Sequence, residues 1–326
     1  GQPNVGVSNT FGFGNLPDYG VPSIMTADGP AGLRISGECS MNTTAWPCAT
    51  LLACTWNPAL VQQVGQAGAE EVKENNLAVW LTPAVNIHRN PLCGRNFEYY
   101  SEDPLIAGKM GAAMVKGIQS QHIAASVKHF AANNKETNRK HSDSRVSERA
   151  LREIYLKGFE IIVKEAQPWT IMSSYNAING HRASENRELL EDVLRGEWGF
   201  KGLESQDFIM NPNYAVLKEY ALNGGTMTTF TGENTMAAVS EKFAYWTTEN
   251  VGQDTELMSA IKQAMTWQAY ALANSNALDG MASSTRLVSV RTWYDNALVA
   301  VQVVFAALTV LAAAMYVLND RKSKKQ

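Results

Sequence analysis

Apolar positions in the first five-sixths of the chain follow two alternating spacings. Short apolar runs of strand length alternate with longer stretches in which apolar residues recur every three or four positions. The predicted strands are 21–26, 77–81, 124–130, 170–175 and 202–207. The predicted helices are 58–75, 102–119, 147–165, 187–198 and 254–276.

Strands that alternate with helices over about 250 residues indicate a parallel α/β fold. The leading form is a (β/α)8-type TIM barrel, which we assign to residues 1–274. A doubly wound sheet is the alternative. No glycine-rich nucleotide-binding turn follows the first strand, which disfavours both that sheet and a nucleotide-dependent α/β enzyme.

A different pattern occupies residues 297–318, where only Gln302 and Thr309 interrupt an apolar run. At 1.5 Å per residue this run would be roughly 33 Å long, close to the ~30 Å hydrocarbon core of a bilayer. Trp293 and Tyr294 precede it, as interfacial aromatic residues do. The pattern predicts a transmembrane helix, and a buried C-terminal helix is the alternative.

The resulting layout has a linker at 275–292, a membrane helix at 293–320 and a basic tail at 321–326. Positive charge after the helix predicts a cytoplasmic tail, so the barrel would lie outside the cell. The opening Gly1-Gln2-Pro3-Asn4 is neither basic nor apolar, as a signal peptide would be. We therefore expect the chain to be a fragment of a longer exported protein.

Composition narrows the function classes. Hydrophobic residues make up 45% and charged residues 18%, an ordinary globular balance. The net charge is −3 although the tail is basic, so the body is acidic and nucleic acid is not an expected partner. The four cysteines, Cys39, Cys48, Cys54 and Cys93, lack the CxxC spacing of zinc sites. A Cys39–Cys48 disulfide and free thiols both stay open. No cluster has convincing metal-ligand spacing, so no metal or cofactor is expected.

Polar side chains stand at the end of each predicted strand or just after it. They are Asp28, then Asn86, His88 and Arg95, then Lys128 and His129, then Tyr175 and Asn176, and finally Asp207. The active site of a parallel barrel forms at the carboxyl ends of its strands, so these side chains should converge on one cleft. Carboxylates, cations and aromatic rings are the groups that bind sugars.

Six segments between residues 20 and 210 are similar to glycoside hydrolase family 3. They are TADGPAGLR (26–34), GRNFE with YSEDP (94–98, 100–104), VKHF (127–130), SRVSER (144–149), MSSYN with NG (172–176, 179–180), and GFKGL (199–203), which leads to Asp207. The resemblance implies a TIM barrel and a retaining, exo-acting β-glycosidase of β-glucosidase type. Loop 131–135 favours that group over members that cleave N-acetylglucosaminides.

The resemblance also implies residue roles. Asp207 matches the nucleophile that forms a covalent glycosyl-aspartate. The terminal sugar would be bound by Asp28, Arg95, Lys128, His129, Arg139 and Tyr175, of which Arg139 is the loosest match.

Each of these residues also has a structural interpretation. Asp28 could cap a turn, Arg95 could pair with Glu98 or Glu102, and Lys128 could form a buried salt bridge; His129 could be structural, Arg139 a surface charge and Tyr175 a core aromatic. The run His141-Ser142-Asp143 is interpreted as a loop, because adjacent residues rarely form a triad.

The chain departs from the family pattern before the nucleophile. The strand reads Glu204-Ser205-Gln206, where the family has apolar residues before Thr-Asp-Trp or Ser-Asp-Trp, and Phe208 replaces the tryptophan. Glu204 could therefore have displaced Asp207. A catalytically impaired, membrane-anchored carbohydrate-binding barrel is the alternative function.

The acid/base is the second departure, because the family commonly carries it on another domain. The order of barrel, linker and membrane helix resembles rearranged members whose second domain precedes the barrel. We therefore expect an upstream domain or a second chain to supply it, and part of the barrel's N-terminal region to be missing.

Overall fold

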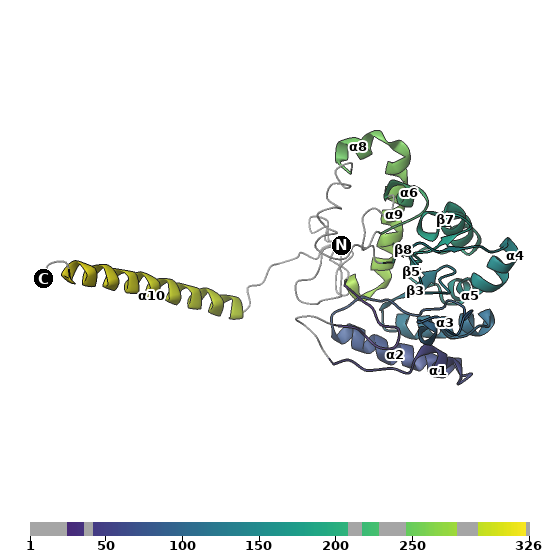
Figure 1. The fold of residues 1–326 in the computed structure, drawn as a ribbon, viewed down its shortest axis with the longest axis horizontal. Helices are drawn as coiled ribbons and strands as arrows, with labels where there is room; N and C mark the ends of the chain where they lie inside the picture. Colours follow the sequence, from purple (N-terminus) through teal and green to yellow (C-terminus); the bar gives the residue numbers. More distant parts are fainter. Residues whose placement is uncertain (1–24, 36–41, 208–216, 228–245, 279–292, 324–326) are drawn as a thin grey trace. The chain divides into compact units, whose positions relative to one another are not determined.

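The computed structural model describes residues 25–35, 42–207, 217–227, 246–278 and 293–323. The chain divides into two compact units, Gly1–Gly280 and Met281–Gln326. The sheet and its helices belong to the first unit, and the second contains the long helix α10 (Trp293–Ser323) (Figure 1).

Five parallel strands form the centre of the first unit. In spatial order they are β1 (Thr26–Ala27), β2 (Val79–Trp80), β3 (Ala124–Phe130), β5 (Thr170–Ser173) and β8 (Leu203–Gln206). Their spatial order is their chain order, as in a β/α barrel, and each of their residues is buried. Among the described residues, the predicted barrel is therefore a half-barrel of five parallel strands.

Helices connect the successive strands. α1 (Ala49–Ala53) and α2 (Pro58–Glu74) precede β2, and α3 (Pro104–Gln119) precedes β3. The next connection contains α4 (Glu148–Ala150), the π-helical turn η4 (Leu151–Tyr155) and α5 (Lys157–Ala166); the π-helix η6 (Glu188–Glu197) precedes β8. After β8 come α6 (Leu217–Leu222), α8 (Thr248–Gln253), α9 (Thr255–Asn274) and the short 3-10 helix η7 (Asn276–Leu278).

Two helix starts follow directly from local sequence. The side chain of Asn57 accepts a hydrogen bond from the backbone N–H of Leu60 at the start of α2. The Asp103 side chain likewise accepts hydrogen bonds from backbone N–H groups at the start of α3. Both helices carry proline at their first position. Capping side chains satisfy free N–H groups, and proline has no N–H to satisfy, so these boundaries agree closely with the sequence.

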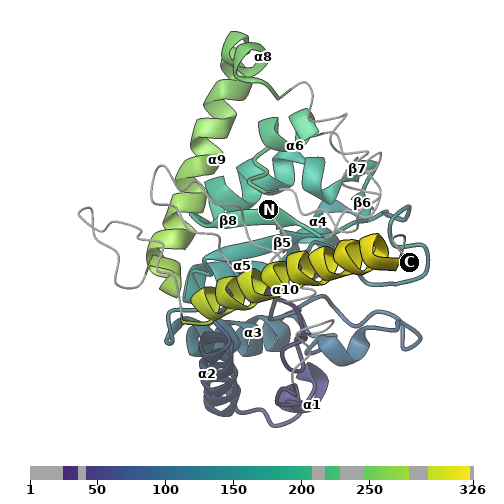
Figure 2. The ribbon, with the colours of Figure 1, turned by 90° about the vertical axis from the view of Figure 1, so that its left-hand side faces the viewer.

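The helices pack closely on one another and on the sheet. Figures 1 and 2 show α2, α3 and α5 as a layer beside the strands. A Cβ atom at Gly117 of α3 would lie 2.1 Å from the carbonyl oxygen of Gln62 in α2, so only glycine permits this approach. The Phe130 ring of β3 lies 5.2 Å from the Phe159 ring and 5.9 Å from the Trp198 ring, which ties the strand to the helices.

A second sheet, which the sequence pattern did not predict, contains β4 (Asp143–Ser144), β6 (Ala177–Ile178) and β7 (His181–Arg182). β6 and β7 form a hairpin around Asn179 and Gly180, whose φ angles of 50° and 95° are typical of a tight hairpin turn. Strands of two residues are too short to give an alternating pattern.

The second unit contains an apolar helix in the region where the sequence predicts a membrane span. Residues Asn296–Met315 have a mean hydropathy of 2.4, and none of this window is buried. By length and composition this helix could cross a membrane.

Other predictions concern residues outside the described ranges. They are the first part of strand 21–26, Cys39, Phe208, most of linker 275–292 and the end of tail 321–326. Cys48, Cys54 and Cys93 carry free thiols.

Candidate active site

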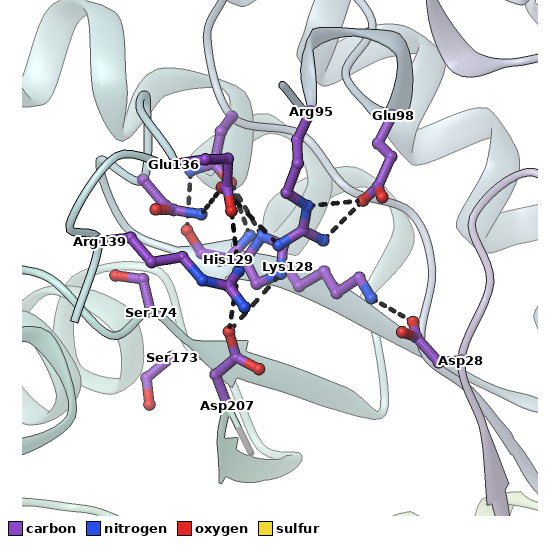
Figure 3. A network of polar contacts seen from close by, with 12 residues as sticks. Asp28, Arg95, Glu98, Lys128, His129, Glu136, Arg139, Ser173, Ser174 and Asp207 are labelled. Carbon is purple, nitrogen blue, oxygen red and sulfur yellow. Dashed lines mark hydrogen bonds and ion pairs between the residues drawn. The ribbon is translucent and has the colours of Figure 1, made fainter. Parts of the chain in front are cut away.

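The turn after β1 places Asp28 beside Lys128 of β3. Gly29 adopts a φ of +116°, which favours glycine, and its carbonyl oxygen accepts hydrogen bonds from the Gly32 N–H at 3.1 Å and the Trp80 indole at 3.0 Å. Lys128 Nζ donates to Asp28 Oδ1 at 2.5 Å (Figure 3). The lysine side chain is only 2% exposed.

The charge of Lys128 decides the ionisation of Asp28. Burial tends to raise the pKa of this carboxyl group, but the charge and hydrogen bond of Lys128 more than offset it, and Arg34 adds to the effect. The result is a pKa of about 2. Asp28 is therefore a carboxylate at neutral pH.

His129 follows Lys128 directly and reaches the same site. The register between β3 and β5 shifts between Lys128 and Phe130, an irregularity of the kind that redirects side chains. Asn86 fixes the His129 backbone: its Oδ1 accepts from the His129 N–H at 2.9 Å and its Nδ2 donates to the carbonyl oxygen at 2.8 Å.

The imidazole of His129 is neutral. Burial lowers its pKa well below the usual range, and the positive charges of Arg95, Lys128 and Arg139 lower it further. Its Nε2 lies 3.9 Å from Asp207 Oδ2.

A chain of alternating charges leads from Arg95 to Asp207 (Figure 3). Arg95 donates to Glu98 at 2.6 Å and lies 4.0 Å from Glu136. Glu136 lies 3.3 Å from Arg139, and Arg139 lies 3.9 Å from Asp207. The guanidinium carbon of Arg139 also lies 4.8 Å from the centre of the Tyr175 ring, a cation–π distance.

Asp207 stands at the carboxyl end of β8, and its N–H donates to the Ser173 carbonyl oxygen at 3.1 Å. Only 9% of its side chain is exposed. Asp28, Arg95, Lys128, His129, Arg139, Tyr175 and Asp207 all lie in this one region, as the sequence predicts; their roles stay predictions.

The glycosyl hydrolase family 3 N-terminal domain matches residues 15–227, which is most of the chain. The chain belongs to glycoside hydrolase family 3. It is 65% identical over 208 residues to beta-glucosidase A of Butyrivibrio fibrisolvens, which covers 64% of this chain and 25% of the relative. It is 53% identical over 198 residues to an exo-alpha-(1->6)-L-arabinopyranosidase of Bifidobacterium longum, covering 58% of this chain and 26% of the relative.

Solved structures agree with this family. Beta-glucosidase 3B of Thermotoga neapolitana, in complex with alpha-D-glucose, matches with a TM-score of 0.73 and 43% identity. The match covers 81% of this chain and 37% of that chain. The chain therefore has the TIM-barrel-like α/β fold of this family. It spans about a quarter of the length of the two curated relatives named above, 25% and 26%.

The structure bears on the structural interpretations given above for three residues of this family-3 site. Arg95 does pair with Glu98, and Lys128 does form a buried salt bridge. Arg139 is not a solvated surface charge, because it contacts three side chains of the site.

Two further expectations concern neighbouring side chains. His141 is exposed, Ser142 donates to the Arg139 carbonyl oxygen, and Asp143 pairs with Arg145, so these residues form no triad. The Glu204 carboxyl group hydrogen-bonds to Tyr220 of α6 and to Ser173 of β5, and no ion pair joins it to a described cation of the site.

Glu136 and Tyr99 are site residues that the sequence did not predict. Glu136 joins Arg95 to Arg139, and the Tyr99 ring packs edge-on against His129 at 6.4 Å. Burial raises the pKa of Tyr99, so its phenol keeps its proton. The only signal for Glu136 was its place in the loop after β3.

Within the described ranges, no group of three His, Cys, Asp or Glu side chains could hold a metal ion.

Proposed function

We propose that this family-3 chain is the barrel part of a retaining, exo-acting β-glycosidase that hydrolyses terminal β-linked sugars, with glucose or a similar sugar as substrate. The observation that carries the proposal is the position of Asp207 at a strand end, with Arg139 and the neutral His129 both 3.9 Å from its carboxylate. The relatives named beta-glucosidase support the same substrate class.

In the proposed reaction, Asp207 attacks the anomeric carbon and forms a covalent glycosyl-aspartate while the glycosidic C–O bond breaks. The leaving oxygen takes a proton from a general acid. Water then attacks the anomeric carbon, loses its proton to the same group, and releases the sugar and Asp207. No metal or cofactor takes part.

The proposed sugar-binding residues divide by chemistry. Asp28 would accept hydrogen bonds from sugar hydroxyls, while Lys128, Arg95 and Arg139 would donate them. The Tyr175 ring offers an apolar surface for a sugar ring. His129 would act as a neutral hydrogen-bonding group beside Asp207.

The general acid/base is assigned to no described residue. Glu98 hydrogen-bonds to Arg95, and Glu136 lies between Arg95 and Arg139, which suits positioning of cations better than proton transfer. We propose that another domain or a second chain supplies this group, and that the half-barrel belongs to a closed barrel of eight strands.

A catalytically impaired binding barrel is less well supported. The polar strand β8 keeps regular parallel pairing with β5, from Thr170 opposite Leu203 to Ser173 opposite Gln206. Its polar residues are buried without a shift of register, and Asp207 follows at the strand end.

The test uses the complete protein and an aryl β-glucoside, with release of the phenol as the readout. Asp207→Asn should abolish turnover, while the control Glu153→Gln, on an exposed ion pair of the helix surface, should not change it. A mechanism-based fluorosugar should label the enzyme covalently at Asp207. Full activity of Asp207→Asn would exclude the assigned nucleophile, and reversible binding without labelling or turnover would favour the binding barrel.

We further propose residues 1–274 as the catalytic domain, 275–292 as a linker, 293–320 as a single membrane span and 321–326 as a cytoplasmic tail. The exposed apolar window Asn296–Met315 supports the span. Carbonate extraction of membranes should leave the complete protein in the pellet, and protease added outside intact cells should remove the barrel. Release by carbonate would refute the anchor.

A further inference from the structure

Glu204 is fully buried within β8, three residues before the proposed nucleophile Asp207. Successive side chains of a strand point to opposite faces, so Glu204 and Asp207 face opposite sides of the sheet. Glu204 Oε2 lies 2.6 Å from Tyr220 Oη of α6. The mechanism proposed above does not use this carboxyl group.

The hydrogen bonds around Tyr220 require one more proton than its phenol can give. Tyr220 Oη lies 2.6 Å from Glu204 Oε2 and 2.8 Å from the Met227 carbonyl oxygen, and the Met227 N–H donates to it at 3.0 Å. A phenol has a single hydrogen, so with an ionised Glu204 one of the two short O···O contacts would have none.

A protonated Glu204 supplies a hydrogen to both short O···O contacts. Its O–H donates to Tyr220 Oη, and the Tyr220 O–H donates to the Met227 carbonyl oxygen. The Met227 N–H then uses the second lone pair of the phenol oxygen. Each short O···O contact then has one hydrogen, and the Met227 N–H is shared between the phenol oxygen and the Glu204 carbonyl oxygen.

The surroundings favour the neutral acid. Arg195 of η6 is the cation that acts on Glu204 among the described residues, but it donates to the Gly202 carbonyl oxygen at 3.1 Å and to Thr226 Oγ1 at 3.2 Å. Burial acts most strongly on the pKa of Glu204 and outweighs the hydrogen bonds of Ser173 and Tyr220 and the charge of Arg195, which lower it. Burial raises the pKa of Glu204 to about 7, and raises that of Tyr220 well above its usual range, so the phenol does not compete for the charge.

This network fixes the edge of β8 that faces away from β5. Met227 forms a parallel bridge with Ser205; its N–H donates to the Glu204 carbonyl oxygen at 3.0 Å, and the Gln206 N–H donates to its carbonyl oxygen at 3.1 Å. β5 holds the other edge. The strand that ends at Asp207 is thus paired on both sides, and Tyr220 ties the second pairing to Glu204.

We propose that Glu204 is a positioning residue that works in its protonated form. Its O–H donates a hydrogen bond to Tyr220, and Tyr220 holds the Met227 segment against β8. This pairing keeps Asp207 in place. The inference rests on the proposed glycosidase function. Ionisation of Glu204 removes that proton, so the Met227 pairing loosens and turnover declines on the alkaline side.

The experiment compares Glu204→Gln with the unchanged complete protein, measuring kcat and KM for an aryl β-glucoside and the midpoint of thermal unfolding across pH. The amide of Gln is neutral and can donate to Tyr220. We expect Glu204→Gln to keep kcat within about twofold at acidic pH and to lose the alkaline decline, with KM little changed. The unchanged protein should lose thermal stability as pH rises to about 7, and Glu204→Gln should not.

Loss of activity by Glu204→Gln at every pH would mean that the carboxylate is the working form and would overturn the inference. An unchanged alkaline decline in Glu204→Gln would do the same. If this variant does not fold, infrared spectroscopy of the unchanged protein decides: a buried carboxylic-acid C=O band at weakly acidic pH, lost near pH 8, is expected, and its absence refutes the inference. The infrared and unfolding readouts need no turnover, so failure of the glycosidase proposal stays distinguishable.

Discussion

Lys128 and Asp28 are 100 positions apart in the chain, yet Lys128 Nζ donates to Asp28 Oδ1 at 2.5 Å. The pair joins β3 to the turn after β1 and so spans β2, which lies between them in the sheet. The lysine side chain is almost completely buried and the aspartate partly so. A buried pair of this kind is costly to break, because the remaining charge is left without compensation.

We therefore predict that Lys128→Met destabilises the complete protein by about 3 kcal/mol, near the lower end expected for a broken buried pair. The double variant Lys128→Met with Asp28→Leu should recover part of this loss, because no buried charge remains. Urea unfolding measures both. Neither variant should bind glucose well, and equal stability of the single variant and the unchanged protein would contradict a compensating pair.

The pKa of Asp28 predicts an acid limit of stability. It is lowered from 3.8 to about 2, so the folded state favours the carboxylate. This contribution is fully present above pH 3.8 and is lost as the pH falls towards 2. It amounts to about 2 kcal/mol, at 1.36 kcal/mol per pKa unit.

Asp28→Asn should therefore lose stability at neutral pH but show a flatter profile between about pH 4 and pH 2. Thermal unfolding at closely spaced pH values provides the measurement. Parallel profiles for Asp28→Asn and the unchanged protein would show that other carboxyl groups set the acid limit.

His129 predicts a pH effect at a higher range, also with loss of stability on the acid side. Its pKa in the folded protein is well below 6.5, so the unfolded chain takes up a proton first as the pH falls. Stability from this group is complete above about pH 6.5 and declines below it. His129→Gln should remove that decline and lower kcat about 10- to 100-fold, because His129 lies beside Asp207.

The exposed His141 provides the matched control for this experiment. His141→Gln should leave both the unfolding profile and kcat unchanged. If both variants alter the profile alike, the decline cannot be assigned to a buried imidazole.

The elements predicted best from sequence have strong local signals. The strand Ala124–Phe130 agrees with its predicted bounds, because a short, largely apolar run that ends in charged residues indicates a buried strand that leads to a site. The predicted helix 102–119 began two residues before α3, where Asp103 caps it. The predicted helix 147–165 covers α4, η4 and all of α5 except its last residue, but its periodicity did not indicate the π-helical turn at Leu151–Tyr155.

Site residues were predictable where a polar residue stands at the end of an apolar run. They were not predictable where a loop residue contacts side chains that are distant in sequence. Asp28 and Asp207 follow strands and Lys128 lies near the end of β3, whereas Glu136 reaches Arg95 and Arg139 from a loop without such a signal. Glu204 is a third case. Its place near Asp207 in sequence suggested competition, while strand alternation directs it to Tyr220 on the opposite face.

Arg139 offers a test of site geometry that leaves the fold intact. Its guanidinium lies 3.3 Å from Glu136, 3.9 Å from Asp207 and 4.8 Å from the centre of the Tyr175 ring. A planar guanidinium can meet two carboxylates and stack on a ring at once, whereas the ammonium of lysine is a point charge. Arg139→Lys should therefore lower kcat/KM for an aryl β-glucoside about 10- to 100-fold, equivalent to about 1.4–3 kcal/mol of transition-state stabilisation.

The neighbouring Lys140 gives the matched control, because its Nζ lies 5.5 Å from the same Tyr175 ring and it forms no ion pair with the described residues. Lys140→Met should keep kcat/KM within about twofold, since it removes only a weak contact with the ring. Unfolding midpoints should be similar for both variants, which separates a catalytic effect from a loss of folded protein. Equal losses of kcat/KM in the two variants would show that general positive charge near Tyr175, and not the shape of the Arg139 guanidinium, supports the reaction.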